Sequence, residues 1–266
     1  MKKLALAAAL LASMSAANAY QTEVGASYEN TDFDAGDLDT FAIGGKYYFN
    51  PVSNSTGPLA EAAFLNRASN IGLGYANASG DGDEDIDAIG VSAEYYIPNT
   101  QFYVGGSINR TDFGGDKGNG YALEVGFLPM TGWIAAIGVA DTEESVDPLQ
   151  VSKLGFVSTA GSALAAGEDT AVTLRTKYVG KVGTNDVNLE AQGLIGDENA
   201  FRVAGDLYLD PTLSVGISYA DSTVEDSDGV FGIRAQKFLT PVAAVGIGYS
   251  TTDGADAFGI NGTFRF

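Results

Sequence analysis

The sequence contains no cysteine and no histidine. Without cysteine the fold has no disulfide to support it, and no thiol chemistry is available. Without histidine a Ser-His-Asp triad cannot form, and the commonest ligands of a zinc site are missing. A glycine-rich phosphate-binding loop of the Walker type is absent as well. We therefore expect no cofactor, no metal site and no enzymatic activity.

Basic residues are scarce, with 14 Lys and Arg against 34 Asp and Glu and a formal net charge of −20. Binding to nucleic acid requires clusters of Lys and Arg that neutralise phosphates, so we expect no nucleic-acid partner. Strongly acidic chains are often disordered. In this sequence, however, 45% of the residues are hydrophobic, which argues for a folded chain.

Long hydrophobic runs are absent after Tyr20, so the sequence predicts no transmembrane helix there. The earlier apolar run, residues 4–14, is too short to span a bilayer. It follows a short basic segment, and residues 17–19 (ANA) have the small-x-small form of a cleavage site. We interpret residues 1–19 as a cleaved bacterial signal peptide and residues 20–266 as a single exported domain.

The apolar residues of this domain alternate with polar or small ones, which is the pattern of strands with two different faces. In TFAIGGKYYF, residues 40–49, one face carries Phe41, Ile43, Gly45, Tyr47 and Phe49. Such segments run for about 9 to 12 residues, long enough to cross a bilayer as tilted strands. We predict strands near residues 20–29, 38–49, 70–78, 86–97, 101–110, 119–128, 132–142, 170–180, 186–195, 200–209, 213–220, 229–238, 242–251 and 256–266.

Two kinds of connection separate these segments and mostly take turns. Short ones often contain proline, as at Pro98 and Pro211, and longer ones are acidic, as in DFDAGDLD at residues 32–39. The strands of a soluble β-sandwich also alternate apolar and polar residues. A sandwich, however, has no reason to place aromatic residues at both ends of its strands. We therefore predict an all-β fold, a transmembrane antiparallel up-and-down β-barrel with short periplasmic turns and longer acidic extracellular loops.

The aromatic residues form two predicted belts, as at the two interfaces of a membrane. The belt beside the long loops contains Tyr28, Tyr75, Tyr121, Tyr219 and Tyr249. The belt beside the short turns contains Tyr47, Tyr48, Phe49, Tyr95, Tyr96, Phe102, Tyr103, Phe127, Trp133, Tyr208 and Phe238.

The strand number depends on residues 143–169. An even count of about fourteen follows if this stretch is one long external loop. Its apolar residues, among them Leu149 and Phe156, indicate that it can fold into the lumen as a constriction. Alternatively it holds another strand pair, which gives about sixteen strands. We prefer fourteen, because the later turns then keep their sidedness.

Several local strings point to a known family. They are Tyr20-Gln21, GPLAEAAFLNRASN at residues 57–70, YALEVG at 121–126, DLYLDPTLSVG at 206–216 and the terminal aromatic strand. Together they resemble the porin family of gammaproteobacterial outer membranes, in particular the carbapenem-associated porins of acinetobacters. The string at 57–70 is the most specific. The resemblance implies an outer-membrane β-barrel that passes small hydrophilic solutes.

The string at residues 57–70 also has a physical interpretation. After Pro58, residues such as Leu59 and Ala62 can form a short amphipathic turn of helix on the periplasmic side. We prefer to interpret it as a long turn that packs beneath the barrel. The alternative is a segment that enters the lumen and narrows it.

If the apolar face of each strand meets lipid, the alternate positions line the lumen. The charged residues at those positions are Glu23, Lys46, Glu94, Glu124, Arg175, Lys177, Glu190, Arg202, Asp206, Arg234 and Arg265. They can form reciprocal salt bridges in a filled lumen, or a charged pore wall that sets ion selectivity. Isolated acids lie in the first half of the sequence and most bases lie in the second half. If the two halves form opposite walls of the lumen, these walls carry charges of opposite sign and create a transverse electric field.

The chain ends in FGINGTFRF, residues 258–266, and the alternation continues to the last residue. We predict that this last strand pairs with the strand near Tyr20 and closes the barrel. Phe266 then resembles the C-terminal aromatic signal by which outer-membrane barrels are recognised for assembly.

These features predict an outer-membrane porin of a Gram-negative bacterium that lets small hydrophilic solutes or ions diffuse passively. Its acidic external loops predict a weak preference for cations. The alternative function is a closed structural or adhesive barrel with a filled lumen. The expected partners are outer-membrane lipid, the barrel-assembly machinery and small solutes, and a monomer is favoured over an oligomer.

Overall fold

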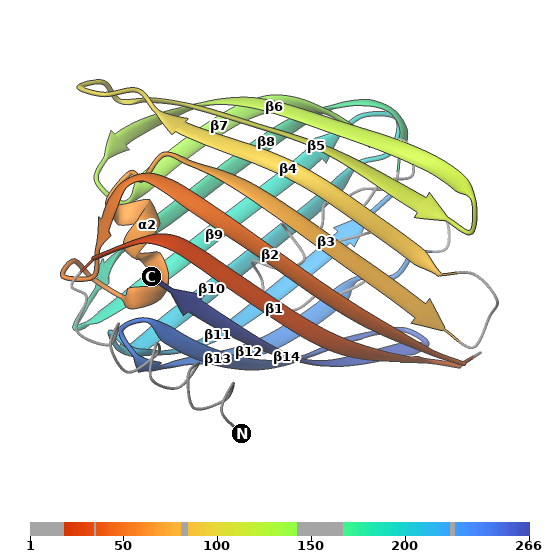
Figure 1. Cartoon of the computed structure of the whole chain (residues 1–266). Coiled ribbons are helices and arrows are strands. Elements are labelled where there is room, and N and C mark those ends of the chain that lie inside the picture. Colours follow the sequence, from red (N-terminus) through yellow and green to blue (C-terminus); the bar gives the residue numbers. More distant parts are fainter. Residues whose placement is uncertain (1–18, 35, 81–84, 143–166, 224–226) are drawn as a thin grey trace, which may run out of the picture.

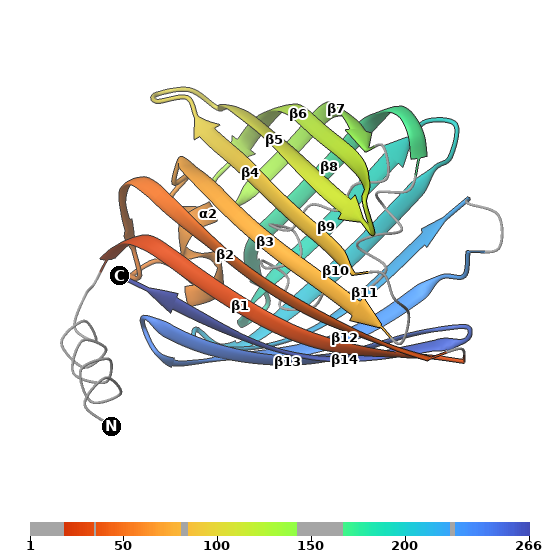
Figure 2. The same ribbon diagram turned by 45° about the vertical axis from the view of Figure 1, so that its right-hand side comes forward.

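The computed structural model describes residues 19–34, 36–80, 85–142, 167–223 and 227–266. There the strands form one closed antiparallel barrel, in which each strand pairs with its neighbours in sequence and β1 pairs with β14 (Figures 1 and 2). The strands are β1 (Ala19–Phe33), β2 (Gly36–Ser53), β3 (Asn70–Gly80), β4 (Ile86–Tyr96), β5 (Phe102–Phe113), β6 (Asp116–Met130), β7 (Trp133–Thr142), β8 (Gly167–Val182), β9 (Asn185–Ile195), β10 (Ala200–Asp210), β11 (Leu213–Ser222), β12 (Val230–Thr240), β13 (Ala243–Thr252) and β14 (Ala255–Arg265).

The closed barrel confirms the predicted all-β up-and-down fold with fourteen strands, not sixteen. β7 is hydrogen-bonded directly to β8, so no further strand pair is inserted between them. Residues 143–166 of the predicted constriction loop (143–169) lie outside the described residues. Its last three residues belong to β8, which begins at Gly167. The predicted signal peptide also lies outside the described residues, except Ala19, with which β1 begins.

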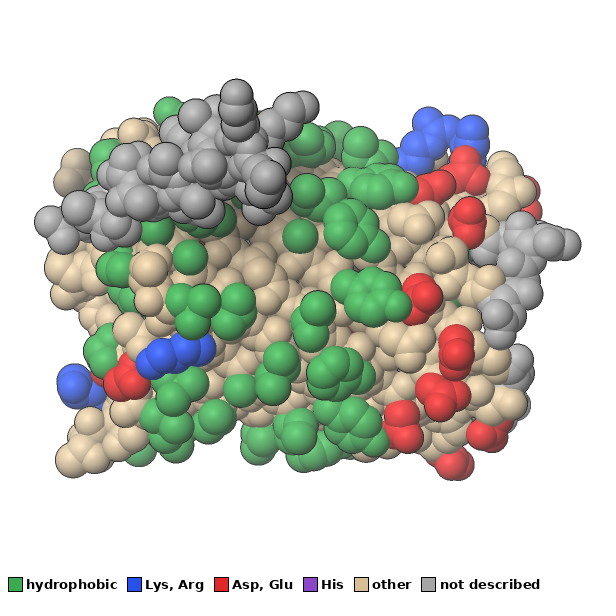
Figure 3. Space-filling model, turned by 60° about the horizontal axis from the view of Figure 1, so that its bottom comes forward, with side chains coloured by type: hydrophobic (Ala, Val, Ile, Leu, Met, Phe, Trp, Pro, Cys, Tyr) green, Lys and Arg blue, Asp and Glu red, His purple; other side chains and the backbone are tan. Residues whose placement is uncertain are grey.

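The alternation of each strand separates an outer apolar face from an inner face. In β3 the outward side chains of Ile71 and Leu73 are 45% and 56% exposed, whereas Gly72 and Gly74 are buried. Figure 3 shows hydrophobic side chains across the middle of the outer surface and acidic ones gathered at one end. An apolar outer band of this kind matches the hydrocarbon of a bilayer.

The aromatic residues beside the short turns divide between the two faces. Tyr47 and Trp133 are exposed on the outside, as predicted for an interfacial belt. The prediction was wrong for others, which are buried on the lumen side: Tyr48, Tyr103, Tyr208 and Phe238. Adjacent residues of a strand point to opposite faces, so Tyr47 and Tyr48 cannot both meet lipid.

The tyrosines beside the long loops are exposed, and most are tied to an acidic residue. Their hydroxyls donate hydrogen bonds to aspartate carboxylates at 2.5 to 3.0 Å. The pairs are Tyr28–Asp39, Tyr75–Asp87, Tyr219–Asp221 and Tyr249–Asp256. The acidic end of the barrel therefore begins directly at the tyrosine belt.

The two terminal strands close the barrel as predicted. β14 pairs with β1 from Glu23↔Arg265 to Phe33↔Ala255. At the end of this seam, Phe266 donates its backbone N–H to the carbonyl of Thr22 at 2.9 Å, and its own carbonyl accepts from Gln21 and Thr22. The last residue of the chain therefore belongs to the wall.

The connection between β2 and β3 contains two short helical turns, η1 (Leu59–Glu61) and α2 (Ala62–Leu65). They lie within the mouth of the barrel at the end that carries the C-terminus (Figures 1 and 2). No helix in the part of the chain that the structure describes is long and apolar enough to cross a membrane.

Candidate functional site

The connection between β2 and β3 enters the lumen, and we call residues 57–69 the lumen segment. Its first residues meet the wall formed by β12 and β13, because Leu59 packs against Phe238 and Ala244. The backbone N–H of Leu59 also donates to the carbonyl of Pro211, in the turn after β10, at 2.8 Å. One side of the mouth is thereby joined to the segment by both packing and a hydrogen bond.

The rest of the lumen segment reaches the other walls. Ala62 packs in a cluster with Tyr20 and Tyr48 of β1 and β2. Phe64 packs against a second cluster, which includes Tyr103 and Ile134 of β5 and β7. The segment thus contacts strands on several sides of the lumen. The preferred interpretation, a turn packed beneath the barrel, was wrong, since the buried aromatic residues of the short-turn end attract its apolar side chains inward.

A buried acid fastens the centre of the lumen segment. The carboxylate of Glu61 accepts a 2.8 Å hydrogen bond from the hydroxyl of Tyr208. It also forms a 2.8 Å ion pair with Lys177, whose ammonium lies 5.3 Å from the ring centroid of Phe64. Charge-assisted hydrogen bonds are the stronger kind, so Glu61 links the segment firmly to β8 and β10.

Arg265 supports the beginning of the lumen segment from the closing strand. Its guanidinium donates a 2.7 Å hydrogen bond to the carbonyl of Leu59 and a 2.6 Å bond to the carboxylate of Glu23. The same group lies 4.7 Å from the ring centroids of both Tyr20 and Phe238. The seam of the barrel and the lumen segment therefore share one arginine.

Apart from Arg202, the other charged residues predicted for the lumen form ion pairs along the wall. The pairs and their nitrogen–oxygen distances are Lys46–Glu94 at 3.8 Å, Arg175–Glu124 at 2.6 Å, Lys177–Glu190 at 2.8 Å and Arg234–Asp206 at 2.7 Å. Of the predicted lumen bases in the second half of the chain, Arg175, Lys177, Arg234 and Arg265 are thus neutralised by acids in contact with them. This arrangement corresponds to reciprocal pairing rather than to two opposed walls of opposite charge.

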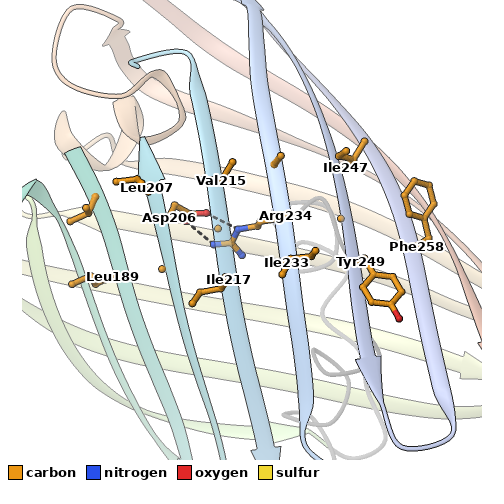
Figure 4. A pocket seen from close by; sticks show the side chains of 15 residues that line it. Leu189, Asp206, Leu207, Val215, Ile217, Ile233, Arg234, Ile247, Tyr249 and Phe258 are labelled. Atoms are coloured by element: carbon orange, nitrogen blue, oxygen red, sulfur yellow. Dashed lines mark hydrogen bonds and ion pairs between the residues drawn. The ribbon is translucent and has the colours of Figure 1, made fainter. Parts of the chain in front are cut away.

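Several of these pairs join strands that are not neighbours, and a glycine occupies the strand between. Asp206 and Arg234 face each other over Gly216 of β11 (Figure 4). Arg175 reaches Glu124 across β7, where a Cβ at Gly138 would lie 2.8 Å from the Cβ of Glu124. Because glycine has no side chain, the inner face of the middle strand leaves space in which the two long side chains meet.

Arg202 differs from the other charged residues predicted for the lumen, because it has no oppositely charged partner in the described ranges. It is half-buried on β10 and forms no ion pair with another residue in the described ranges. Its neighbours in register are Gln192 on β9 and Ala220 on β11, both uncharged. No acid in the described ranges therefore neutralises its guanidinium.

Two acids of the described lumen, Glu29 and Glu61, were not among the predicted lumen residues. Glu29 has the same strand parity as Glu23, so the alternation of β1 carries the signal that would have found it. Glu61 lies outside any alternating segment, and no periodic signal marks it. In the described residues, no three acidic side chains come together as a metal site.

Known proteins resemble this chain over nearly its whole length. The sequence profile of the family described as "Putative general bacterial porin" matches residues 1–266. Among solved structures the chain is similar to the crystal structure of the Acinetobacter baumannii outer membrane protein Omp33, with 33% identity, a TM-score of 0.72 and coverage of 94% of this chain and 99% of that one. No match was found among curated proteins.

Two more distant structures share the fold alone. A bacterial polysaccharide outer membrane secretin is 10% identical, with a TM-score of 0.53 and coverage of 93% of this chain and 99% of that one. The CymD monoaromatic hydrocarbon channel is 10% identical, with a TM-score of 0.52 and coverage of 96% and 91%.

Proposed function

The chain belongs to the family of general bacterial porins, and on that premise we propose that it is a passive diffusion channel for small hydrophilic solutes or ions in a Gram-negative outer membrane. The family and the fold are those of a channel rather than an enzyme. The observation that carries the proposal is a charged, hydrogen-bonded inner wall inside a closed barrel whose outer face is apolar.

The eleven charged residues predicted for the lumen serve in this proposal as the pore wall. Their pairing fixes the long side chains against the wall, which keeps them out of the solute path. Arg202 is the cation of this set that no carboxylate in the described chain neutralises. It is the residue through which the wall can attract an anionic group of a solute.

The acidic end of the barrel supports a weak preference for cations. The aspartates tied to the tyrosine belt lie where solutes enter, and their charge raises the local cation concentration over a Debye length of about 8 Å at physiological salt. Reversal potentials across a planar bilayer in a salt gradient test this preference. A clear preference for anions would contradict it.

The lumen segment supports a restricted rather than a wide pore. It contacts β1, β2, β5, β7 and the β10–β11 turn, so solutes pass around it or displace it. The same contacts favour a second candidate function, a closed structural or adhesive barrel. The Glu61 contacts with Lys177 and Tyr208 would then serve to hold the lumen shut.

Swelling of proteoliposomes in neutral sugars of increasing size separates the two functions. A channel admits the smaller sugars and excludes the larger ones, and the cut-off measures the pore without assuming a substrate. Exclusion of every sugar, together with zero ion conductance, would favour the closed barrel.

Two further roles belong to this proposal. Phe266 serves as the assembly signal read by the barrel-assembly machinery, and its backbone bonds to Gln21 and Thr22 place its aromatic ring beside the closing seam. A monomer suffices for function, because one chain already forms a closed barrel.

A further inference from the structure

Glu29 is a buried lumen acid that has no partner among the described residues. It lies on β1 between Gly259 of β14 and Thr40 of β2 in the strand register, and its side chain is only 3% exposed. Within the described chain it makes no hydrogen bond and no ion pair. The lumen carboxylates described above, Glu23, Glu61, Glu94, Glu124, Glu190 and Asp206, are each paired with Lys or Arg.

No cation of the described strands pairs with Glu29. Along its row of strand pairs the next charged side chain is Arg234, beyond Gly259 and Gly248. Three strand spacings of about 4.8 Å place the two backbones about 14 Å apart. Arg234 also donates two hydrogen bonds to Asp206. In the other direction the row continues through Thr40, which is uncharged.

Two buried hydroxyl side chains lie beside Glu29 in the strand register. Ser27, two residues earlier on the same face, is 4% exposed, and its buried hydroxyl has no hydrogen-bond partner among the described residues. Thr40, directly opposite, adds a second buried hydroxyl. An ionised carboxylate buried without a partner is strongly unfavourable, and either a proton or a bound cation removes that penalty.

A single carboxylate with neutral hydroxyls matches a singly charged cation. Sites for Ca²⁺ gather several carboxylates, and Mg²⁺ prefers a carboxylate together with waters or phosphates. Among the described residues Glu29 belongs to no group of three or more acidic side chains that could hold such an ion. We propose that Glu29, Ser27 and Thr40 form a lumen site for a monovalent cation, either an alkali-metal ion or the ammonium group of a solute.

The site adds a cation-binding step to the proposed channel function, because a cation held inside the lumen lies on the path of permeating cations. Its role in transport rests on that function, whereas its occupancy does not. A site that fills with cations in a protein that conducts no ions would therefore refute the channel and leave the site intact.

Anomalous diffraction from crystals of the whole protein soaked in a thallium(I) salt tests the site. Tl⁺ is expected to appear in contact with the Glu29 carboxylate of the wild type and to disappear in Glu29→Gln. Asp39→Asn is the matched control, since it removes the same charge from an exposed outward position on the adjacent strand of the same hairpin, and the peak is expected to remain. Absence of the peak from the wild type, or its persistence in Glu29→Gln, would overturn the proposal.

A competition arm distinguishes the two sources of positive charge. Loss of the Tl⁺ peak in excess methylammonium identifies a site that accepts the ammonium group of a solute, and retention identifies a metal-ion site. A melting measurement covers the case in which crystals of the variant fail to form. The wild type is expected to melt higher in KCl than in tetramethylammonium chloride of equal ionic strength, and Glu29→Gln is expected to show no difference. Equal responses of the two proteins would count against the site.

Discussion

Asp206 and Arg234 lie on strands that are not neighbours, yet they meet over Gly216 of the strand between them. Arg234 donates hydrogen bonds of 2.8 and 2.7 Å to the two carboxylate oxygens of Asp206. A Cβ at Gly216 would collide with a carboxylate oxygen of Asp206 and lie 3.0 Å from Nε of Arg234. The absence of a side chain at Gly216 is therefore a condition for this ion pair.

Replacing Gly216 by alanine is expected to separate the pair and destabilise the barrel. Breaking a buried ion pair costs about 3 to 5 kcal/mol, and relaxation of the long arginine recovers part of it. Gly205→Ala is the matched control, because its Cβ would meet only a flexible Leu189 methyl at 3.4 Å and a carbonyl at 3.6 Å. Unfolding by denaturant in lipid vesicles measures both variants. Equal stabilities would show that the pair contributes little.

Removing the carboxylate of Glu61 is expected to loosen the lumen segment and raise ion conductance. Glu61→Ala deletes the contacts with both Lys177 and Tyr208. Tyr208→Phe deletes only one of them and leaves the ion pair, so its conductance should stay closer to that of the wild type. Single-channel recording in planar bilayers checks the order of the three proteins. A Glu61→Ala conductance equal to the wild-type value would mean that this acid does not hold the segment.

Arg202→Gln is expected to shift ion preference further toward cations. The substitution removes a lumen cation that no described acid neutralises, so the barrier to cations falls and the attraction for anions weakens. Lys181→Gln provides the comparison, because Lys181 is largely exposed near a short turn and its contact with Asp186 is 3.9 Å long. Reversal potentials in a salt gradient report the change. An identical shift in both variants would indicate a general charge effect instead of a local one.

Two substitutions separate the structural and signalling roles of Phe266. Phe266→Ala keeps the backbone hydrogen bonds to Gln21 and Thr22 but removes the aromatic ring. Deletion of Phe266 removes both. If the ring is the assembly signal, both variants should reach the outer membrane poorly, as judged by the amount of folded barrel in membrane fractions. Normal assembly of Phe266→Ala would leave only the seam contacts as its role.

The sequence predicted the barrel, its strand order and its closing seam because alternation with period two is a local signal repeated in every strand. It placed strand ends less well. β1 was predicted to end near residue 29 and extends to Phe33, since its polar residues beyond the tyrosine belt still pair with β2. Hairpins that project past the membrane lose the apolar alternation but keep their hydrogen bonds.

The site was only partly predictable. Parity identifies which charges face inward, but it does not say which of them meet. The Asp206–Arg234 contact depends on a glycine in a third strand, and the Glu61 contacts depend on a non-repeating segment that folds back into the barrel. Such relations join residues far apart in sequence, where no periodic signal exists.

The conductance of a variant in which residues 59–65 are replaced by a short Gly-Ser linker tests the central claim most directly. If the protein is a channel narrowed by the lumen segment, the wild type conducts and the variant conducts more, with a larger sugar cut-off in liposome swelling. Absence of conductance in both proteins, each shown to be folded in the bilayer, would contradict the account.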